Sequence, residues 1–243
     1  LAHYLEHIMF KGTRNFGTID AAKEAVLLDS IQNRFEVYRT LKDSLQRRAY
    51  YQQIDSLSQL AAKYFIPNEY DKLMSSIGAE GTNAYTSNDV TCYVEDIPAN
   101  ELENWAKIES DRFQNMVIRG FHTELEAVYE EYNISLGNDN RKLFAALNAM
   151  LFPGHPYGTQ TTIGTQEHLK NPSIVNIKNY FSRYYVPNNT AICMAGDFDP
   201  DKAIAIIDKY FGTWKPNPNL SQPEYAPIPE RTAPADTTVV GQE

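Results

Sequence analysis

Two histidines and a glutamate lie together at the start of the sequence, in the order His3-Tyr4-Leu5-Glu6-His7. On a helix, positions three and four residues apart share a face, so both imidazoles can reach one metal ion. Neutral imidazole is a common ligand of Zn²⁺, and a carboxylate beside the ion can take a proton from water. The alternative is a solvated or hydrogen-bonded polar face of an ordinary helix. The apolar residues around the two histidines favour the metal site.

A catalytic metal site needs a third protein ligand, and an acidic segment from Glu124 to Glu131 can supply it. These two glutamates are separated by two helical turns, so they share one face of a predicted helix. Three protein ligands leave a fourth position open for water, as catalytic zinc requires. Glu130 is the rival third ligand, because it lies about 100° round the helix from Glu131. An exposed acidic helix is the alternative for each of these carboxylates.

Periodicity and turn residues indicate that helices alternate with a few short strands. Residues 21–64 contain neither Gly nor Pro, and their apolar spacing predicts two long helices that form a hairpin with a turn near residues 47–51. Further elements are expected as helices at 1–10, 68–77, 101–117, 121–135, 141–152, 173–184 and 201–211, as a β-hairpin at 83–97 and as a strand at 191–195. Hairpins in place of regular βαβ units predict an α+β fold, a largely antiparallel sheet packed with helices.

The composition is that of a globular protein and narrows the range of partners. Apolar residues make up 42% of the chain and charged residues 22%, as in ordinary globular proteins. The 31 acidic residues against 22 basic ones give a net charge of −9, which disfavours binding to nucleic acid. No apolar run approaches the roughly 18 residues of a membrane-spanning helix. Cys92 and Cys193 lie in apolar runs and are interpreted as buried free thiols, with a disulfide between them left open.

Several segments, in order along the chain, resemble signatures of the M16 family of zinc metallopeptidases, which includes pitrilysin, insulin-degrading enzyme and the mitochondrial processing peptidases. The first family motif, an H-x-x-E-H helix that inverts the H-E-x-x-H order of other zinc peptidases, has its counterpart in LAHYLEHIMFKGT. Later motifs have counterparts in NAYTSNDVTCY, ELEAVYEE, HPYGTQTTIGTQEHL, FSRYYVPNNTAICMAGDFD and FGTW. Together these matches, from residue 1 to about residue 214, are more specific than any one motif.

The resemblance implies a role for each residue at the metal. His3, His7 and Glu131 correspond to the three ligands of one Zn²⁺ ion. Glu6 corresponds to the general base that activates the attacking water, and Glu124 to an accessory glutamate behind the site. The implied activity is that of a zinc-dependent endopeptidase that hydrolyses peptides or small unfolded polypeptides.

The resemblance also implies a binding mode for the substrate. Asn83 and Ala84 correspond to the edge strand along which the family binds extended peptides by β-augmentation. In that mode, backbone pairing supplies affinity and side-chain pockets supply preference. The alternative for Asn83 is an ordinary strand residue beside a turn.

The sequence departs from the family pattern in two places. The stretch between His7 and Glu131 is longer than usual, which a helical insertion at about 21–64 explains. The first strands of the family fold and everything after its first domain are missing. We therefore expect a catalytic domain truncated at its N-terminus at residues 1–215 and a Pro-rich linker at residues 216–243. Such a fragment alone should be weakly active or inactive, and other M16-like domains of the same protein, or a partner subunit, would complete it.

Two other functions stay open. A non-catalytic M16-like domain would bind polypeptide or support a catalytic partner, although it would not need the full set of His3, Glu6, His7 and Glu131. Alternatively, the 21–64 hairpin would be the docking surface of a plain interaction module. The sequence does not determine the cellular compartment of the protein. The bacterial periplasm or cell envelope is favoured only because members of the family are found there.

Overall fold

The computed structural model describes residues 2–241, and helices dominate it. The helices are α1 (Ala2–Ile8), α2 (Ala21–Tyr38), α3 (Ser44–Ala62), α4 (Glu69–Ser76), α5 (Leu102–Asn115), α6 (Phe121–Leu136), α7 (Asp139–Leu151), α8 (Pro156–Thr159), α9 (Gln166–Lys170), α10 (Ile174–Tyr184) and α11 (Pro200–Phe211), with short 3₁₀ helices at Ala99–Glu101 and Pro187–Asn189. One pair of strands in this part of the chain, β1 (Glu80–Thr86) and β2 (Thr91–Asp96), forms an antiparallel hairpin. Among the described helices, none is long and apolar enough to cross a membrane.

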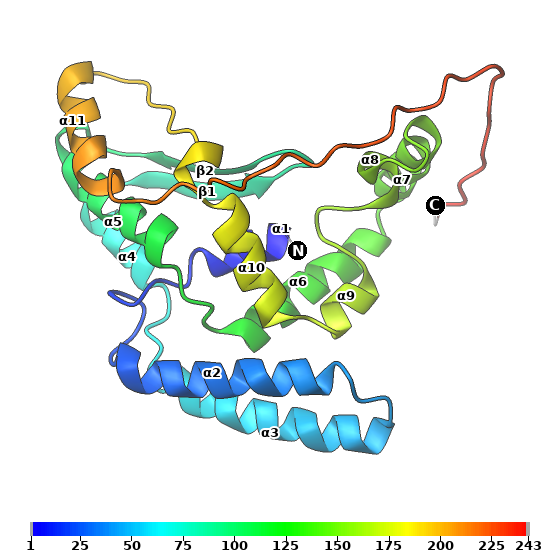
Figure 1. Cartoon of the computed structure of the whole chain (residues 1–243), viewed down its shortest axis with the longest axis horizontal. Helices are drawn as coiled ribbons and strands as arrows, with labels where there is room; N and C mark the ends of the chain where they lie inside the picture. The colour runs from blue at the N-terminus through cyan, green and yellow to red at the C-terminus, as the bar shows by residue number, and fades with distance from the viewer. Residues whose placement is uncertain (1, 242–243) are drawn as a thin grey trace.

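The elements are arranged in tiers. Figure 1 shows the α2–α3 hairpin at one end of the molecule, below α1, α6 and α10. The β-hairpin lies toward the opposite end, with α5 and α11 on one side of the view and α7 and α8 on the other. The segment after α11 extends across the molecule toward α8, where the ring centroid of Tyr225 lies 4.8 Å from that of His155. Helix α1, which carries the two histidines, therefore lies in the middle of the molecule.

The core is built from helix faces. Its main cluster joins buried side chains of α1, α2, α3, α6, α9 and α10 with two loop residues: Tyr4, Leu5, Ile8, Ile31, Phe35, Ile54, Ala61, Ile118, Phe121, Val128, Ile163, Leu169, Ile174 and Ile177. Within it, Tyr4 is 1% exposed, and its hydroxyl donates a hydrogen bond of 2.8 Å to the backbone carbonyl of Phe121. This bond anchors α1 on the start of α6, the helix that carries the acidic segment.

The prediction of an α+β fold with a largely antiparallel sheet is wrong, because the chain is mostly helical, with 56% helix and 7% strand. Residues 80–96 form a β-hairpin where one was expected. Residues 191–195 form no strand, since they pair with no segment among the residues described, and Ile192 stays 39% exposed. The main core cluster contains no residue of β1 or β2. Helices that were expected to cover a sheet instead bury their apolar faces against one another.

The helical hairpin predicted within residues 21–64 is confirmed, but its turn lies at residues 39–43. The cause is Asp43, whose side chain accepts a hydrogen bond of 2.8 Å from the backbone N–H of Gln46 and so caps α3. Asp20 caps α2 in the same way. The first predicted helix is also present, with Leu1 outside the described residues.

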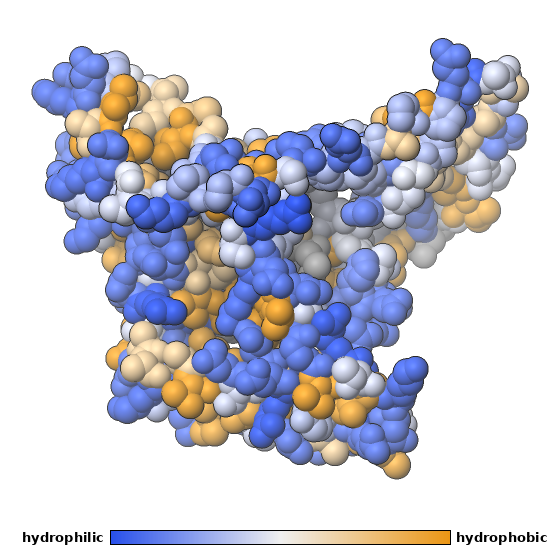
Figure 2. Space-filling view, in the orientation of Figure 1, coloured by the Kyte–Doolittle hydropathy of each residue, from blue (hydrophilic) through white to orange (hydrophobic). Residues whose placement is uncertain are grey.

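Several side chains of the apolar pattern that predicts the helical hairpin lie at the surface. On the α2–α3 hairpin, Val26 is 67% exposed, Leu45 76% and Leu60 45%. Figure 2 shows orange patches over this tier of an otherwise largely hydrophilic face. Cys92 is half-buried and Cys193 is exposed, both as free thiols, so the interpretation of both as buried was wrong. The hairpin thus buries one face and leaves apolar side chains on the other.

A buried ion pair holds the loop after α1 against α2. Glu24 and Arg119 are each 1% exposed, and two hydrogen bonds of 2.6 and 2.7 Å join the guanidinium to the carboxylate. The same guanidinium donates to the backbone carbonyls of Lys11 and Thr13, at 2.8 and 2.9 Å. Arg119 therefore links α2, the loop that follows α1 and the segment that enters α6.

Removal of this guanidinium is expected to destabilise the fold strongly. Arg119→Ala leaves the Glu24 carboxylate buried without its partner, and breaking a buried pair in this way costs about 3–5 kcal/mol. Denaturant unfolding of the variant and the unaltered protein measures the loss. The matched control is Lys23→Ala, which removes the exposed ion pair with Asp20 and should change little. Equal unfolding midpoints for the two variants would contradict this role of Arg119.

Candidate metal centre

Helices α1 and α6 bring the three predicted metal ligands together. One donor atom from each of His3, His7 and Glu131 can be chosen so that all lie within 4.8 Å of one another. His3 Nε2 lies 3.6 Å from Glu131 Oε2, and His7 Nε2 lies 3.7 Å from Glu131 Oε1. The spacing of the histidines along α1 places both rings on one face, and the packing of α1 on α6 supplies the carboxylate. Glu130, the rival ligand, is not in this cluster of described residues.

The geometry fits a zinc ion. A tetrahedral ion with bonds of about 2.1 Å holds its ligand atoms about 3.4 Å apart. His3 and His7 each approach a different oxygen of Glu131 to near this separation, and one donor atom from each of the three residues lies within 4.8 Å of the others. Two imidazoles and one carboxylate form a known ligand set of catalytic zinc. The side chains of His3, His7 and Glu131 are 22%, 23% and 45% exposed, so water can reach the position between them. The three residues could therefore hold one zinc ion with an open fourth position.

Glu124 lies behind His7 rather than at the metal position. Its Oε2 atom lies 3.4 Å from His7 Nδ1, and its Oε1 atom lies 2.7 Å from Lys11 Nζ. A carboxylate on Nδ1 orients the ring and leaves Nε2 directed at Glu131, an arrangement common around metal-binding histidines. The acidic segment of α6 thus supplies one residue at the metal position and one behind it.

The pKa values of the two imidazoles are shifted in opposite directions. Burial, together with the neighbouring charge of His7, lowers the pKa of His3, which favours the neutral ring that a metal requires. The hydrogen bond to Glu124 raises the pKa of His7 against the opposing effect of burial. Burial opposes ionisation of Glu124, but hydrogen bonds from His7 and Lys11 leave the pKa of this carboxyl lowered. Metal binding at His7 therefore competes with a proton that Glu124 stabilises.

Glu124→Gln is expected to lower the pKa of His7 in the metal-free protein. The amide removes the negative charge that favours the imidazolium, so the ring loses its proton at lower pH. By linkage, the His7–Glu124 contact stabilises the metal-free fold fully below the unfolded-state pKa of His7, and this contribution is lost as the pH rises through the raised folded-state value. NMR titration of the His7 ring protons measures the shift. An unchanged or higher pKa would contradict the contact.

Glu6 lies in a cavity of about 300 Å³ beside the metal position. Its carboxylate is largely buried and accepts a hydrogen bond from the hydroxyl of Thr86, at the end of β1. The same cavity is lined by His3 and, from α7, by Arg141, whose guanidinium has no hydrogen bond or ion pair within residues 2–241. Sequence reasoning missed Thr86 and Arg141, and only Thr86 had a signal, its position in the NAYTSNDVTCY segment.

The two predicted substrate-binding residues differ in their positions. Ala84 lines the cavity that holds Glu6, whereas Asn83 is exposed and does not. The backbone N–H of Ala84 donates a hydrogen bond of 2.9 Å to the side-chain carbonyl of Asn83. Strand β1 pairs with β2 on one side, and no other described strand pairs with its second edge. The cavity and the strand edge are therefore neighbours.

The chain is similar to known zinc proteases. An uncharacterized zinc protease of Mycobacterium leprae is 26% identical over 142 residues, covering 58% of this chain and 32% of that protein. Zinc protease PqqE of Helicobacter pylori is 24% identical over 181 residues, covering 70% of this chain and 40% of that protein. The crystal structure of a protease from Helicobacter pylori matches the fold with a TM-score of 0.67 and 22% identity, over 94% of this chain and 44% of that one. The chain spans less than half the length of each of these relatives.

A family model described as the peptidase M16 inactive domain matches residues 174–242. Residues 174–242 therefore match an M16 peptidase family domain, in agreement with the similarity of the chain to zinc proteases. The matched model is that of the inactive C-terminal domain and not the catalytic N-terminal one, which corrects the more specific expectation drawn from the resemblance. The candidate metal ligands and Glu6 lie outside the matched residues.

Proposed function

We propose that this chain carries the active centre of a zinc-dependent endopeptidase that hydrolyses peptides or small unfolded polypeptides. The observation that supports this function most directly is the convergence of His3, His7 and Glu131 at distances suited to one zinc ion. A domain that only binds polypeptide does not need this ligand set, nor a buried carboxylate such as Glu6 beside it.

His3, His7 and Glu131 would hold the zinc ion, which when bound supplies Lewis-acid polarisation of a carbonyl group and lowers the pKa of water. Glu6 acts as the general base: it accepts a proton from the attacking water and passes it to the leaving amine. The hydroxyl of Thr86 donates to Glu6 Oε2 and holds the carboxylate toward the cavity. Glu124 keeps His7 oriented through Nδ1.

The substrate would bind as an added strand along the open edge of β1. The N–H of Ala84 donates to the neighbouring Asn83 side chain, and an incoming peptide carbonyl can replace that acceptor. The extended peptide would then pass the cavity that contains Glu6 and Arg141. In this binding mode the Asn83 side chain gives up its hydrogen bond with the Ala84 N–H when the peptide binds, and it makes no contact in the cavity.

A second candidate is a non-catalytic domain that binds polypeptide or supports a catalytic partner. The match of residues 174–242 to the M16 inactive domain favours this candidate over the catalytic one. Both candidates can apply to different parts of one chain, with the metal centre between residues 3 and 131 and a non-catalytic segment that starts near residue 174. The boundary at residue 215 that the sequence suggests stays a prediction.

Zinc-dependent hydrolysis by the full-length protein tests the two candidates. The measurement is the initial rate on a quenched fluorescent peptide, before metal removal, after chelation and after zinc is restored. The catalytic candidate predicts a rate that chelation removes and zinc restores. Peptide binding without turnover at full zinc occupancy would favour the non-catalytic candidate.

A further inference from the structure

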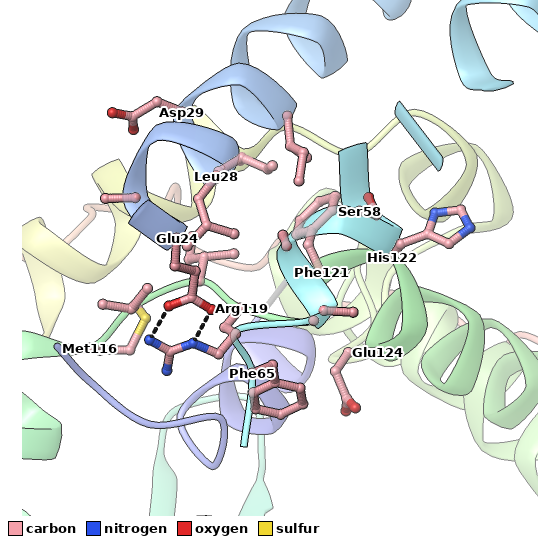
Figure 3. A pocket seen from close by; sticks show the side chains of 18 of the residues that line it. Glu24, Leu28, Asp29, Ser58, Phe65, Met116, Arg119, Phe121, His122 and Glu124 are labelled. Atoms are coloured by element: carbon pink, nitrogen blue, oxygen red, sulfur yellow. Dashed lines mark hydrogen bonds and ion pairs between the residues drawn. The ribbon is translucent and has the colours of Figure 1, made fainter. Parts of the chain in front are cut away.

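A second cavity, of about 430 Å³, lies between the α2–α3 hairpin, the start of α6 and α10. Figure 3 shows the side chains that line it. Most of the wall is apolar, with the side chains of Leu28, Ile31, Phe65, Met116, Phe121 and Phe181 among the lining groups. Its volume lies within the range of about 300–1,000 Å³ typical of small-molecule sites. Of the residues assigned to the metal centre, only Glu124 also lines this cavity.

The ionised groups in the wall are already paired. Glu24 and Arg119 face each other across two hydrogen bonds, drawn as dashed lines in Figure 3. Glu124 is bound to Lys11 and His7. A ligand inside the cavity therefore meets apolar surface and satisfied polar groups, so the buried part of the ligand needs no charge of its own.

The exposed residues of the lining, where the cavity meets solvent, have a different character. Arg14 and Lys178 line it and are exposed, and neither side chain has an ion pair or hydrogen bond with another described residue. One exposed carboxylate, Asp29, lies in the same lining. The exposed part of the lining therefore carries two cations against one anion, and this positive excess would attract an acidic group.

We propose that this cavity binds a small amphipathic acid, with its alkyl chain inside and its carboxylate beside Arg14 and Lys178. Burial of the chain against the apolar wall supplies affinity, and the two cations select the acid over a neutral molecule of equal length. This site does not depend on the proposed peptidase activity, because it uses neither His3, His7 nor Glu6.

Calorimetric titration of the purified protein with octanoate and with octanol tests the proposal at low ionic strength. Octanoate should bind with one molecule per chain and more tightly than octanol. The double variant Arg14→Glu/Lys178→Glu should weaken octanoate by about tenfold or more, since each exposed charge is reversed, and leave octanol within about threefold. Asp29→Asn should tighten octanoate, because it removes the one opposing carboxylate.

Leu28→Trp, which narrows the cavity, should weaken binding of both molecules. Thermal unfolding shows whether the tryptophan variant folds. If it does not fold, the charge variants still decide the test, because their substitutions lie at the surface. No saturable binding of octanoate, equal loss of octanoate and octanol in the charge-reversed protein, or unchanged binding by a folded Leu28→Trp protein would each overturn the proposal.

Discussion

Glu6→Gln should abolish peptide hydrolysis by the full-length protein while zinc stays bound. The amide has nearly the same shape as the carboxylate and can still accept the hydrogen bond from Thr86. It cannot act as a base toward water, and loss of a general base typically costs about 10²–10⁴-fold in rate. Initial rates compared at equal zinc occupancy measure the effect.

Two further variants show whether the loss of hydrolysis rate is caused by removal of the Glu6 carboxylate itself. Glu130→Gln makes the same chemical change at an exposed position on α6, so it should keep the unaltered rate. Thr86→Val removes the hydroxyl that holds Glu6 but keeps the carboxylate, so it should lower the rate less than Glu6→Gln. Near-normal turnover by a zinc-loaded Glu6→Gln protein would remove Glu6 from the catalytic role.

Zinc affinity should fall severely in each of three variants: His3→Ala, His7→Ala and Glu131→Ala. The loss should exceed the roughly 10–100-fold that is typical when a residue hydrogen-bonded to a metal ligand is removed. Each variant removes one of three protein ligands, and the two that remain cannot complete the tetrahedral arrangement. Zinc content after dialysis against a weak competing chelator measures the loss.

The control for the third ligand is its neighbour on α6. Glu130 is exposed and does not belong to the cluster of His3, His7 and Glu131, so Glu130→Ala should keep zinc. If Glu130→Ala loses zinc and Glu131→Ala retains it, the ligand assignment is wrong by one residue.

The clustering of the three proposed ligands could be predicted because its geometry is largely local. His3 and His7 share a face of one short helix, and Glu124 and Glu131 lie two turns apart on another. The contact that joins the two helices, from Tyr4 to the backbone of Phe121, has no signature in the sequence. Arg141 shows the same limit, because its place beside Glu6 depends on how α7 packs rather than on any local spacing.

The fold was harder to predict than the clustering of these side chains. A β-like run such as residues 191–195 shows that a strand is possible, but pairing depends on a neighbouring strand that local sequence cannot supply. The turn of the helical hairpin was misplaced because an uninterrupted helical pattern has no Gly or Pro to end it. The cap at Asp43 decided where α3 begins. Val26 fits the apolar period of α2 and is nevertheless 67% exposed, since the helix buries only part of that stripe.

The family-model match and the geometry concern different residues. The match to the inactive domain covers residues 174–242, whereas the metal candidates come from α1 and α6. A non-catalytic label for the later segment is compatible with a catalytic centre in the earlier one. The functional question therefore depends on whether zinc binds between α1 and α6.

Anomalous X-ray diffraction at the zinc absorption edge, on crystals of the purified protein, tests that point most directly. Our account predicts one anomalous peak per chain, bonded to His3 Nε2, His7 Nε2 and a carboxylate oxygen of Glu131 at about 2.0–2.2 Å. Glu124 should stay on His7 Nδ1, outside bonding distance of the peak. No peak in zinc-containing crystals, or a peak bound by Glu130 in place of Glu131, would contradict the account.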